Sequence, residues 1–549
     1  MTATSTHSAQ RPAPQPGARP SAWGPFRSPD FARMASAQFL SNVGSWMQTV
    51  GAQELMLTLT TSATLVALIQ TAAALPIVLL AIPAGALGDL VDRRWLLIYA
   101  QAFMLLAASA LAVLDFVGLV TPWVLLALIF AVGAGQTVTS PTWQTLQPEL
   151  VPPEDRTQAI SLGAVNMNLS RAIGPAIGGA LYAATSAGVL FVVNAVSFLP
   201  VIGAVARWHE THRRRAGAPE QVRTAIRAGA RYVAASPALR VILLRAGAFT
   251  LFSSALWALL PLVARSHLHL GSGGYGLLLA VVGVGALAGA ATLPRLRGLT
   301  SSNGLMLVGT LLFAAVTLAL AYAREPALAA VVVVFGGFAW ILVLSTLNSQ
   351  YQSTLPGWAK ARGMSYYLVL FQGGGALGSA LLGVLAQRSG LTTALVTAAA
   401  GLALVAVVGL RFPFKAISPR DLLPAGDWPD PHLADGVGPA GAVLVTTEYR
   451  PLPGREQDVI EALYAGRHAR RRTGAVKWSV WQDASDPAKI LEQFAVGSWE
   501  EHLRQHARVS RHDQARLDAV RAMTDPEHPP SVTHWLMPPT HPTRGNGKR

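Results

Sequence analysis

The stretch Gly85-Ala86-Leu87-Gly88-Asp89-Leu90-Val91-Asp92-Arg93-Arg94 decides the fold that this sequence predicts. It places a dense cluster of charges between two long apolar segments, Ala72 to Pro83 and Leu96 to Leu114. Charges at such a position need water, so the loop is expected at a membrane surface, and positively charged loops mark the cytoplasmic side. The stretch therefore predicts a membrane protein and gives its orientation.

Composition indicates the same class of protein. Of the 549 residues, 52% are hydrophobic and only 13% are charged, whereas soluble domains carry about 25% charged residues. The net charge is +15, but the arginines gather in loops between apolar segments, which favours membrane orientation over nucleic-acid binding. The absence of cysteine excludes disulfides and thiolate metal sites. Most of the chain is therefore expected to lie in a lipid bilayer.

The apolar segments have the length of membrane spans, which is about 20 residues. Twelve segments meet this condition, near 34–58, 64–88, 95–115, 121–145, 157–183, 186–206, 239–264, 273–294, 303–322, 327–349, 363–386 and 391–411. Arginines concentrate in alternate loops, which predicts cytoplasmic termini, and the Arg-rich, Lys-poor composition indicates a bacterial plasma membrane. The predicted fold class is an all-α membrane protein with two six-helix halves, followed by a small α+β domain.

These boundaries divide the chain into seven regions. The first 30 residues are polar and lack an apolar core, so they predict a disordered cytoplasmic tail and no signal peptide. The longest loop separates the two halves, and a proline-rich linker follows the last span. The regions are 1–30, the tail; 31–206, the first half; 207–238, the central cytoplasmic loop; 239–411, the second half; 412–441, the linker; 442–537, a cytoplasmic domain; and 538–549, a disordered end.

The region 442–537 has the pattern of a soluble domain. Strands are predicted at 443–449, 475–481, 489–496 and 532–536, and helices at 456–471 and 498–523. This β-α-β-β-α-β order predicts a ferredoxin-like arrangement.

The charged stretch also resembles a known loop. The spacing Gly-x-x-x-Asp-x-x-x-Arg-Arg resembles the signature loop between the second and third helices of major facilitator superfamily transporters, with departures at Leu90 and Asp92. The resemblance implies that the loop is a latch at the cytoplasmic gate, although a simple orienting loop is the alternative. The implied gate residues are Gly85, Asp89, Asp92, Arg93 and Arg94.

The fifth predicted span carries a second motif. Its sequence from Ser170 to Gly179 resembles the antiporter motif of drug exporters in the same superfamily, with Ser170 in place of the first glycine. Small residues allow close approach of helix backbones, and a proline bends a helix. Ordinary helix packing is the alternative explanation. The matching residues are Gly174, Pro175, Gly178 and Gly179.

Arg171 is the strongest single candidate for function. A cation near the bilayer midplane costs at least ~2.5 kcal/mol, so it should face a wet cavity or a partner. Pairing with Asn166, Asn168 or a neighbouring carbonyl is the structural alternative. Arg171 and Glu54, a carboxylate near the outer end of the first span, are the candidates for proton coupling, although Glu54 could simply be solvated.

Polar side chains recur within the apolar spans. In the first span they follow helical spacing from Gln38 to Gln53 and form one polar face. Such a face is expected to line the transport pathway, but each residue could also join helices by hydrogen bonds. The predicted pathway residues are Asn42, Ser45, Gln48, Gln136, Arg171, Asn194, Asn348 and Gln372.

These motifs lead to a predicted function. No phosphate-binding loop is present in the sequence, so transport would depend on a gradient or on no energy source. The resemblance covers about residues 31–411. Together with its extra domain, the chain is similar to the enterobactin-exporter-like or transmembrane secretion effector branch of the superfamily. This implies a non-enzymatic exporter of small organic molecules, such as drugs, siderophores or other secondary metabolites, coupled to protons. Neither a cofactor nor a metal is expected.

The final domain suggests the alternative function. It resembles the antibiotic-biosynthesis-monooxygenase family, which would make the protein a membrane-tethered, cofactor-free oxygenase. His502 and His506, one helical turn apart, could bind zinc, but a solvated helical face explains them more simply. Relatives in that family pair through their sheets, which implies a homodimer. Pairing would cover the apolar side chains of Val443, Val445, Val480 and Leu491, which two helices alone would shield poorly.

Overall fold

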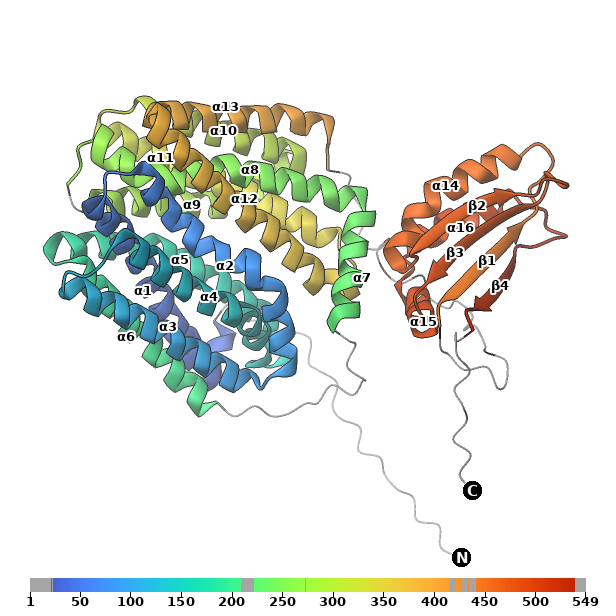
Figure 1. Cartoon of the computed structure of the whole chain (residues 1–549), viewed down its shortest axis with the longest axis horizontal. Helices are drawn as coiled ribbons and strands as arrows, with labels where there is room; N and C mark the ends of the chain where they lie inside the picture. Colours follow the sequence, from blue (N-terminus) through green and yellow to red (C-terminus); the bar gives the residue numbers. More distant parts are fainter. Residues whose placement is uncertain are drawn as a thin grey trace, which may run out of the picture.

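The computed structural model describes residues 21, 23–208, 222–271, 273–414, 421, 423, 425, 433 and 441–538, apart from the side chains of 82, 85–90, 222–228 and 361. Figure 1 shows a bundle of long helices and a smaller domain made by the last part of the chain. Helix α7 (Val222–Ala235) lies at the end of the bundle nearest that domain. We call this end the tail-side end, the opposite one the far end, and the small domain the tail domain.

Within the described residues, twelve long helices form the bundle in two sets of six. The first set is α1 (Pro29–Leu59), α2 (Ala63–Leu90), α3 (Arg93–Phe116), α4 (Pro122–Leu146), α5 (Arg156–Ala184) and α6 (Ala187–Arg207). The second set is α8 (Pro237–Leu262), α9 (Gly274–Leu299), α10 (Ser302–Tyr322), α11 (Pro326–Ser353), α12 (Lys360–Ser389) and α13 (Leu391–Arg411). Short helical turns are η1 (Gly24–Arg27), η2 (Gln147–Glu149), η3 (Pro153–Asp155), η4 (Val263–His267) and η5 (Gly357–Ala359).

Local sequence sets where several of these helices begin. The side chains of Ser28, Thr121 and Ser301 each accept a hydrogen bond from the backbone N–H three residues later. Pro29 and Pro122 stand at the first helical position, where no N–H is needed. The helix starts therefore follow from capping residues that the sequence supplies.

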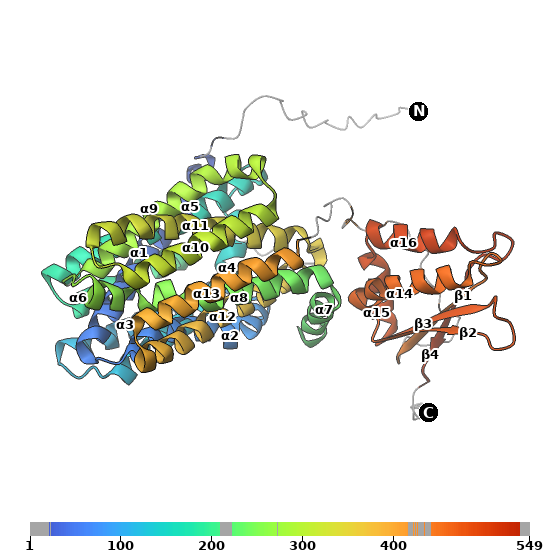
Figure 2. The ribbon, with the colours of Figure 1, turned by 90° about the horizontal axis from the view of Figure 1, so that it is seen from above.

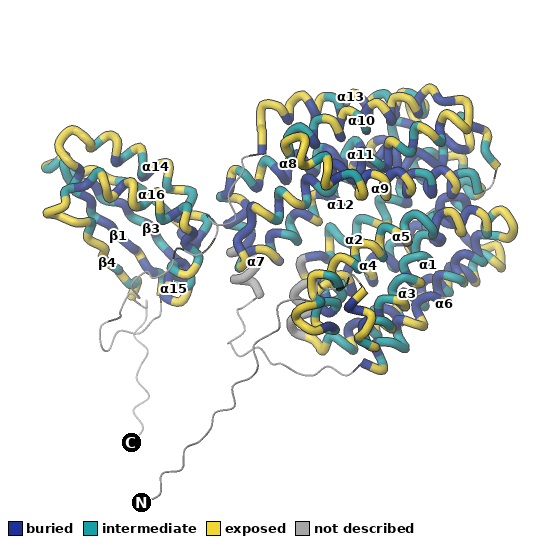
Figure 3. The backbone as a smooth tube through the Cα atoms, turned by 180° about the vertical axis from the view of Figure 1, so that it is seen from behind, coloured by how far each residue is buried: buried dark blue, intermediate teal, exposed yellow. Residues whose placement is uncertain are grey.

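Ten of the described helices are long and apolar enough to cross a membrane, whereas the sequence analysis predicted twelve. The two that fall short are α1 and α5, which have sufficient length but carry more polar residues. Large apolar side chains on the outside of the bundle, such as Leu106, Leu244 and Leu404, are 61 to 71% exposed. Figure 3 shows such exposed positions along α13. Exposed apolar surface of this kind is what a lipid-facing bundle requires.

The two halves pack on each other through α2 with α12 and through α5 with α9. On the first pair, the Ala63 N–H donates to Gln387 Oε1 at 2.6 Å, and the Thr71 hydroxyl donates to the Ala376 carbonyl at 2.9 Å. On the second pair, a Cβ on Gly283 would lie 2.6 Å from the Cα of Ala172, so only glycine permits that crossing. Small residues thus bring the halves into direct backbone contact.

Helix α7 was not predicted, because its residues lie in the basic central loop. It connects the bundle to the tail domain: Arg231 forms an ion pair with Glu501 at 2.9 Å. Glu501 also pairs with Arg508 at 2.8 Å, and the Arg508 guanidinium lies 4.6 Å from the ring centroid of Trp358, next to α12. The tail domain therefore contacts both the central loop and the second half.

The tail domain is a sheet with helices on one face. Its strands are β1 (Val443–Tyr449), β2 (Lys477–Gln482), β3 (Ile490–Val496) and β4 (Ser531–Leu536), and its helices are α14 (Glu456–Thr473), α15 (Trp499–Arg508) and α16 (Arg511–Arg521). The strand order is β2-β3-β1-β4 and all pairs are antiparallel. Figure 2 shows the three helices gathered on the same side of the sheet. This order agrees with the β-α-β-β-α-β prediction.

Two details of the tail domain differ from the prediction. The helix expected at 498–523 is two helices, because Ser510 and Asp513 form a capping box that starts α16. Val443 and Val445 are already buried beneath the helices, so they need no partner. In the strand alternation Leu491 lies on the opposite, open face with Leu444, Trp481 and Trp535, all of which are partly or largely exposed.

Candidate transport pathway

The polar face of α1 is tied to α5 near the tail-side half of the bundle. Gln38 donates from Nε2 to Asn42 Oδ1 at 2.9 Å, and Asn42 donates from Nδ2 to Asn166 Oδ1 at 3.0 Å. Asn166 in turn donates to the Ala35 carbonyl at 2.9 Å. Asn166 is therefore occupied with α1 and does not pair with Arg171.

A second polar cluster joins α1 to α4 and α6. Gln136 Nε2 donates to the Ser45 hydroxyl at 3.3 Å, and the Ser45 hydroxyl donates to Asn194 Oδ1 at 3.5 Å. Asn194 also donates to Gln48 Oε1. Asn194 and Gln48 are buried, while Gln136 is exposed. The structure thus brings four predicted pathway residues together, and Gln136 is the member that reaches open space.

The predicted pathway residues of the second half lie apart from this cluster. Asn348 accepts a hydrogen bond from Gln352 at 3.0 Å within α11, five positions before that helix ends at Ser353. Gln372 lies on α12 and is partly exposed. Asn348 is therefore nearer the tail-side end than the middle of the bundle.

Arg171 lies in the middle of α5 against an aromatic ring of α1. Its Cζ is 5.2 Å from the ring centroid of Trp46, a cation–π arrangement. Asn168, the other amide considered as its partner, donates to the Ala164 carbonyl of its own helix at 2.9 Å. Trp46 carries no signal in the sequence beyond its position on the polar helix α1.

The glycines of the α5 motif make two close helix crossings. A Cβ on Gly174 would lie 2.5 Å from the Trp46 Cβ, and one on Gly178 would lie 3.0 Å from the Met47 Cα, so both face α1. A Cβ on Gly179 would lie 3.0 Å from the Cα of Gly276 on α9. Pro175 is buried beside them. The motif therefore packs α5 both within its own half and against the other half.

The charged loop between α2 and α3 is partly described. Asp92 caps α3 by accepting from the Arg94 N–H at 2.9 Å. Arg93 pairs with Glu149 at 3.0 Å, and Arg94 donates to the Ala206 carbonyl at the end of α6. These contacts join helix ends of the first half. The side chains at 85 and 89, which belong to the predicted latch, lie outside the described residues.

Glu54 lies at the contact between the halves, near the far end. It is only 5% exposed, and its carboxylate lies near the backbone N–H of Gly273, at the start of α9, and near the positive charge of Arg265. Gly273 has a φ of 90°, in the left-handed region that favours glycine. Glu54 is thus a buried link between α1 and the second half and not a solvated residue.

Arg245 is a buried cation that the sequence analysis did not single out. It stands on α8, where its Nη1 donates to the Phe412 carbonyl at 3.3 Å and to Asn303 Oδ1 at 3.4 Å. Its Cζ lies 4.2 Å from the ring centroid of Phe414. An arginine eight positions into an apolar segment was a signal that could have identified it.

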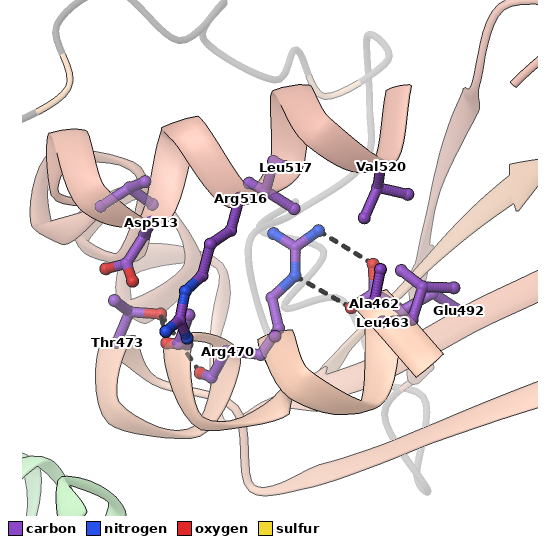
Figure 4. A pocket seen from close by; sticks show the side chains of 12 residues that line it. Ala462, Leu463, Arg470, Thr473, Glu492, Asp513, Arg516, Leu517 and Val520 are labelled. Atoms are coloured by element: carbon purple, nitrogen blue, oxygen red, sulfur yellow. Dashed lines mark hydrogen bonds and ion pairs between the residues drawn. The ribbon is translucent and has the colours of Figure 1, made fainter. Parts of the chain in front are cut away.

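The tail domain contains a buried charge network and a small cavity. Arg470 forms two hydrogen bonds to the carboxylate of Glu492, at 3.1 and 2.9 Å, which Figure 4 shows from close by. Trp478 and Tyr449 also donate to that carboxylate. The adjacent cavity has a volume of about 20 Å³, room for roughly one water molecule, whereas organic ligands need roughly 300 to 1,000 Å³.

Two histidines of the tail domain, His502 and His506, have their imidazole rings in contact. His502 and His506 have ring centroids 4.6 Å apart, and His502 Nδ1 is 3.2 Å from Gln505 Oε1. Burial, with the charge of His506, lowers the pKa of His502 to about 4. Among the described residues, no group of three or more His, Cys, Asp or Glu side chains is arranged to hold a metal ion.

Solved structures of other transporters share the fold of the helical bundle. At low identity the solved structures show the fold alone: a bacterial homologue of the human lysosomal transporter Spinster, inward-facing and occupied, is 15% identical with a TM-score of 0.57 over 70% of this chain and 97% of its own. The nucleoside transporter NupG is 14% identical with a TM-score of 0.54 over 70% of this chain and 100% of its own.

Two curated relatives match part of the chain. The staphyloferrin A transporter of Staphylococcus aureus (strain NCTC 8325 / PS 47) is 30% identical over 165 residues, which cover 30% of this chain and 41% of that protein. The uncharacterized MFS-type transporter YfiS of Bacillus subtilis (strain 168) is 28% identical over 166 residues, 30% of this chain and 39% of its own length. The chain thus spans about two fifths of these relatives.

A family model covers nearly the whole chain. The model described as transmembrane secretion effector matches residues 20–542, a range that includes the tail domain. These findings point to a membrane transporter and not to an enzyme, and they give no support to the oxygenase alternative. The chain belongs to the transmembrane secretion effector family of major facilitator superfamily transporters.

Proposed function

We propose that this transporter is a proton-coupled exporter of small organic molecules, such as drugs, siderophores or other secondary metabolites. The relative that is named a staphyloferrin A transporter supports a siderophore-like substrate. The observation that carries the proposal is the place of Arg171 on α5: the next residue, Ala172, packs directly on Gly283 of the other half. A polar group at that crossing is positioned to respond when the halves rock in alternating access.

The proposed orientation has the tail-side end, both termini and the tail domain in the cytoplasm of a bacterial cell. It is supported by the distribution of positive charges between the two ends. The tail-side loops and helix ends carry Arg93, Arg94, Arg156, Arg240, Arg295, Arg297, Lys360 and Arg362, whereas the far end carries Arg265, Arg324 and Arg388. In this orientation the loop from Gly85 to Arg94 remains the proposed cytoplasmic gate.

Glu54 is the proposed proton carrier, which couples the proton gradient to the movement of the two halves. Arg171 is the second candidate. A charged Glu54 is attracted to the backbone N–H of Gly273 across the halves. Protonation weakens that attraction, because a neutral carboxylic acid is the poorer acceptor. Proton uptake from the far end would therefore loosen the contact between α1 and α9 and favour opening on that side.

Vesicles with an imposed pH gradient test this proposal. Dyes, antibiotics and siderophores are screened for gradient-dependent efflux by the full-length protein. Glu54→Gln is expected to abolish the dependence on the gradient. The matched control is Asp115→Asn, because Asp115 accepts from the Gly188 N–H at 2.7 Å within the first half and does not bridge the halves. Equal gradient dependence in wild type and Glu54→Gln would refute Glu54 as the carrier.

We also propose a homodimer through the open sheet face of the tail domain. Leu444, Trp481, Leu491 and Trp535 provide apolar surface on that face, and pairing would remove it from water. Trp535→Ser in the full-length protein is expected to shift the detergent-solubilised dimer toward monomer, as measured by light scattering. A wild-type protein that is monomeric at high concentration contradicts the dimer.

A further inference from the structure

The guanidinium of Arg171 is an unpaired cation in the middle of the bundle. Arg171 stands fifteen positions after Arg156, the first residue of α5, which is about 22 Å along the helix. Its Nε is buried without a partner, and Arg171 forms no hydrogen bond or ion pair with any residue that the structure describes. The side chain is partly exposed. Packing on Trp46 holds this cation while its donors remain unused.

The carboxylates of the long helices all stand near helix ends, whereas Arg171 stands in the middle of its helix. There are four of them, Asp30, Glu54, Asp89 and Asp115, and each stands within five positions of a helix end. Arg171 is at least thirteen positions from either end of α5. A resident counter-ion for Arg171 is therefore absent from the described middle of the bundle.

The surroundings of Arg171 suit a bound oxyanion. An arginine presents a planar fork of N–H donors that matches a carboxylate at two points. The guanidinium carbon lies over the Trp46 ring, a contact that uses none of the N–H donors. Gly174 permits this stacking, because a Cβ there would collide with the Trp46 side chain. Trp46 of α1 thus positions the guanidinium of Arg171 and leaves its N–H donors unoccupied.

We propose that Arg171, stacked on Trp46, binds an organic anion, so that the transported molecules carry a carboxylate or a similar oxyanion. The inference names the substrate class of the exporter proposed above and rests on that proposal. A bound anion supplies the negative charge that the bundle lacks at this level, and the resulting pair is neutral. Loaded and empty carriers then differ in charge beside Ala172, where the two halves meet.

Equilibrium binding of two matched dyes to the full-length protein in detergent tests the inference. One dye has a free carboxylate and the other is its methyl ester. Wild type is expected to bind the acid at least about tenfold more tightly than the ester. Arg171→Gln should lose this preference, and Arg171→Lys, which keeps the charge without the fork, should fall between them. Arg295→Gln, which removes an exposed cation near the end of α9, is the control and should bind as wild type does.

Thermal unfolding of each variant is measured alongside, so that lost binding is not mistaken for lost folding. The inference is overturned if wild type binds the acid no more tightly than the ester, or if Arg171→Gln keeps the preference. Binding in detergent needs no gradient, so the two proposals can fail separately. If the ester is exported in vesicles and binding shows no preference for the acid, only the proposal of an anionic substrate is contradicted. If binding favours the acid but neither dye is transported in vesicles, only the proposal of an exporter is contradicted.

Discussion

Each half of the bundle holds one arginine more than six positions from either end of its helix, and the two are treated very differently. Arg245 in the second half donates to the Phe412 carbonyl and to Asn303, and it stacks on Phe414. Arg171 in the first half touches the Trp46 ring and leaves its donors unused. Burial of a cation therefore does not by itself indicate function. The absence of partners is the more informative property.

A third arginine, in the tail domain, completes the comparison. Arg470 is buried like Arg245, but the carboxylate of Glu492 neutralises it at two points. The three side chains thus form a series: a full counter-ion for Arg470, neutral dipoles for Arg245, and no polar partner for Arg171. If partners measure the structural role, the effect on stability of disturbing each site should fall in that order.

The largest loss of stability is expected for Glu492→Gln. The change leaves Arg470 as an uncompensated buried charge and weakens the hydrogen bonds from Trp478 and Tyr449. Breaking a buried ion pair in this way costs about 3 to 5 kcal/mol. The measurement is protease resistance of the tail domain in the full-length protein over a denaturant series. Glu448→Gln is the control, because Glu448 and Lys489 form an ion pair that is about one third exposed, and such pairs contribute less than about 1 kcal/mol.

The same site predicts how the tail domain responds to acid. Burial raises the pKa of Glu492, but the charge of Arg470 and the hydrogen bonds donated by Arg470, Trp478 and Tyr449 outweigh it and leave the pKa below the usual value of 4.5. A carboxylate with a lowered pKa in the folded state stabilises the fold above its unfolded pKa and loses that contribution as pH falls through the folded value. Protease resistance should therefore drop on acidification below pH 4.5 in wild type, and an unchanged profile would contradict the ion pair.

A smaller loss is expected for Arg245→Met. The variant removes two hydrogen bonds and a cation–π contact that hold the chain after α13 against α8 and α10. Hydrogen bonds to charged groups contribute about 1.5 to 3 kcal/mol in water-soluble proteins and less within bilayers. We expect a loss of about 1 to 3 kcal/mol in detergent unfolding, with transport reduced only as far as abundance is. Arg240→Met, at an exposed position of the same helix, should change neither.

The long helices could be located from the sequence because span length and apolar runs are local properties. Every predicted span coincides with a long helix, and α13 has the predicted bounds of 391 and 411. Helix α7 was missed because its arginines made the whole segment 207–238 look like a basic loop, although its apolar residues recur at helical spacing. In the structure Arg231 of this helix pairs with Glu501 of the tail domain. The periodicity indicates an amphipathic helix, but one sequence does not show which distant segment that helix contacts.

The candidate site was predicted in its residue types but not in its pairings. Polar spacing on α1 identified Asn42 and Ser45, yet their partners Asn166 and Asn194 lie more than a hundred positions away. From the sequence alone, solvation of Glu54 remained an alternative, because its position near Gly273 depends on how the halves meet. One sequence reports which side chains a helix carries, and the tertiary fold decides which of them remain unpaired.

The smallest effect on stability, and the sharpest contrast with transport, is expected for Arg171→Met. The variant loses a cation–π contact of up to about 2 kcal/mol but also removes a midplane cation that costs at least about 2.5 kcal/mol. The two nearly cancel, so unfolding in detergent should change by less than about 1 kcal/mol while efflux in vesicles is lost. Destabilisation as large as that of Arg245→Met, with efflux following abundance, would show that Arg171 is a structural residue like its counterpart in the second half.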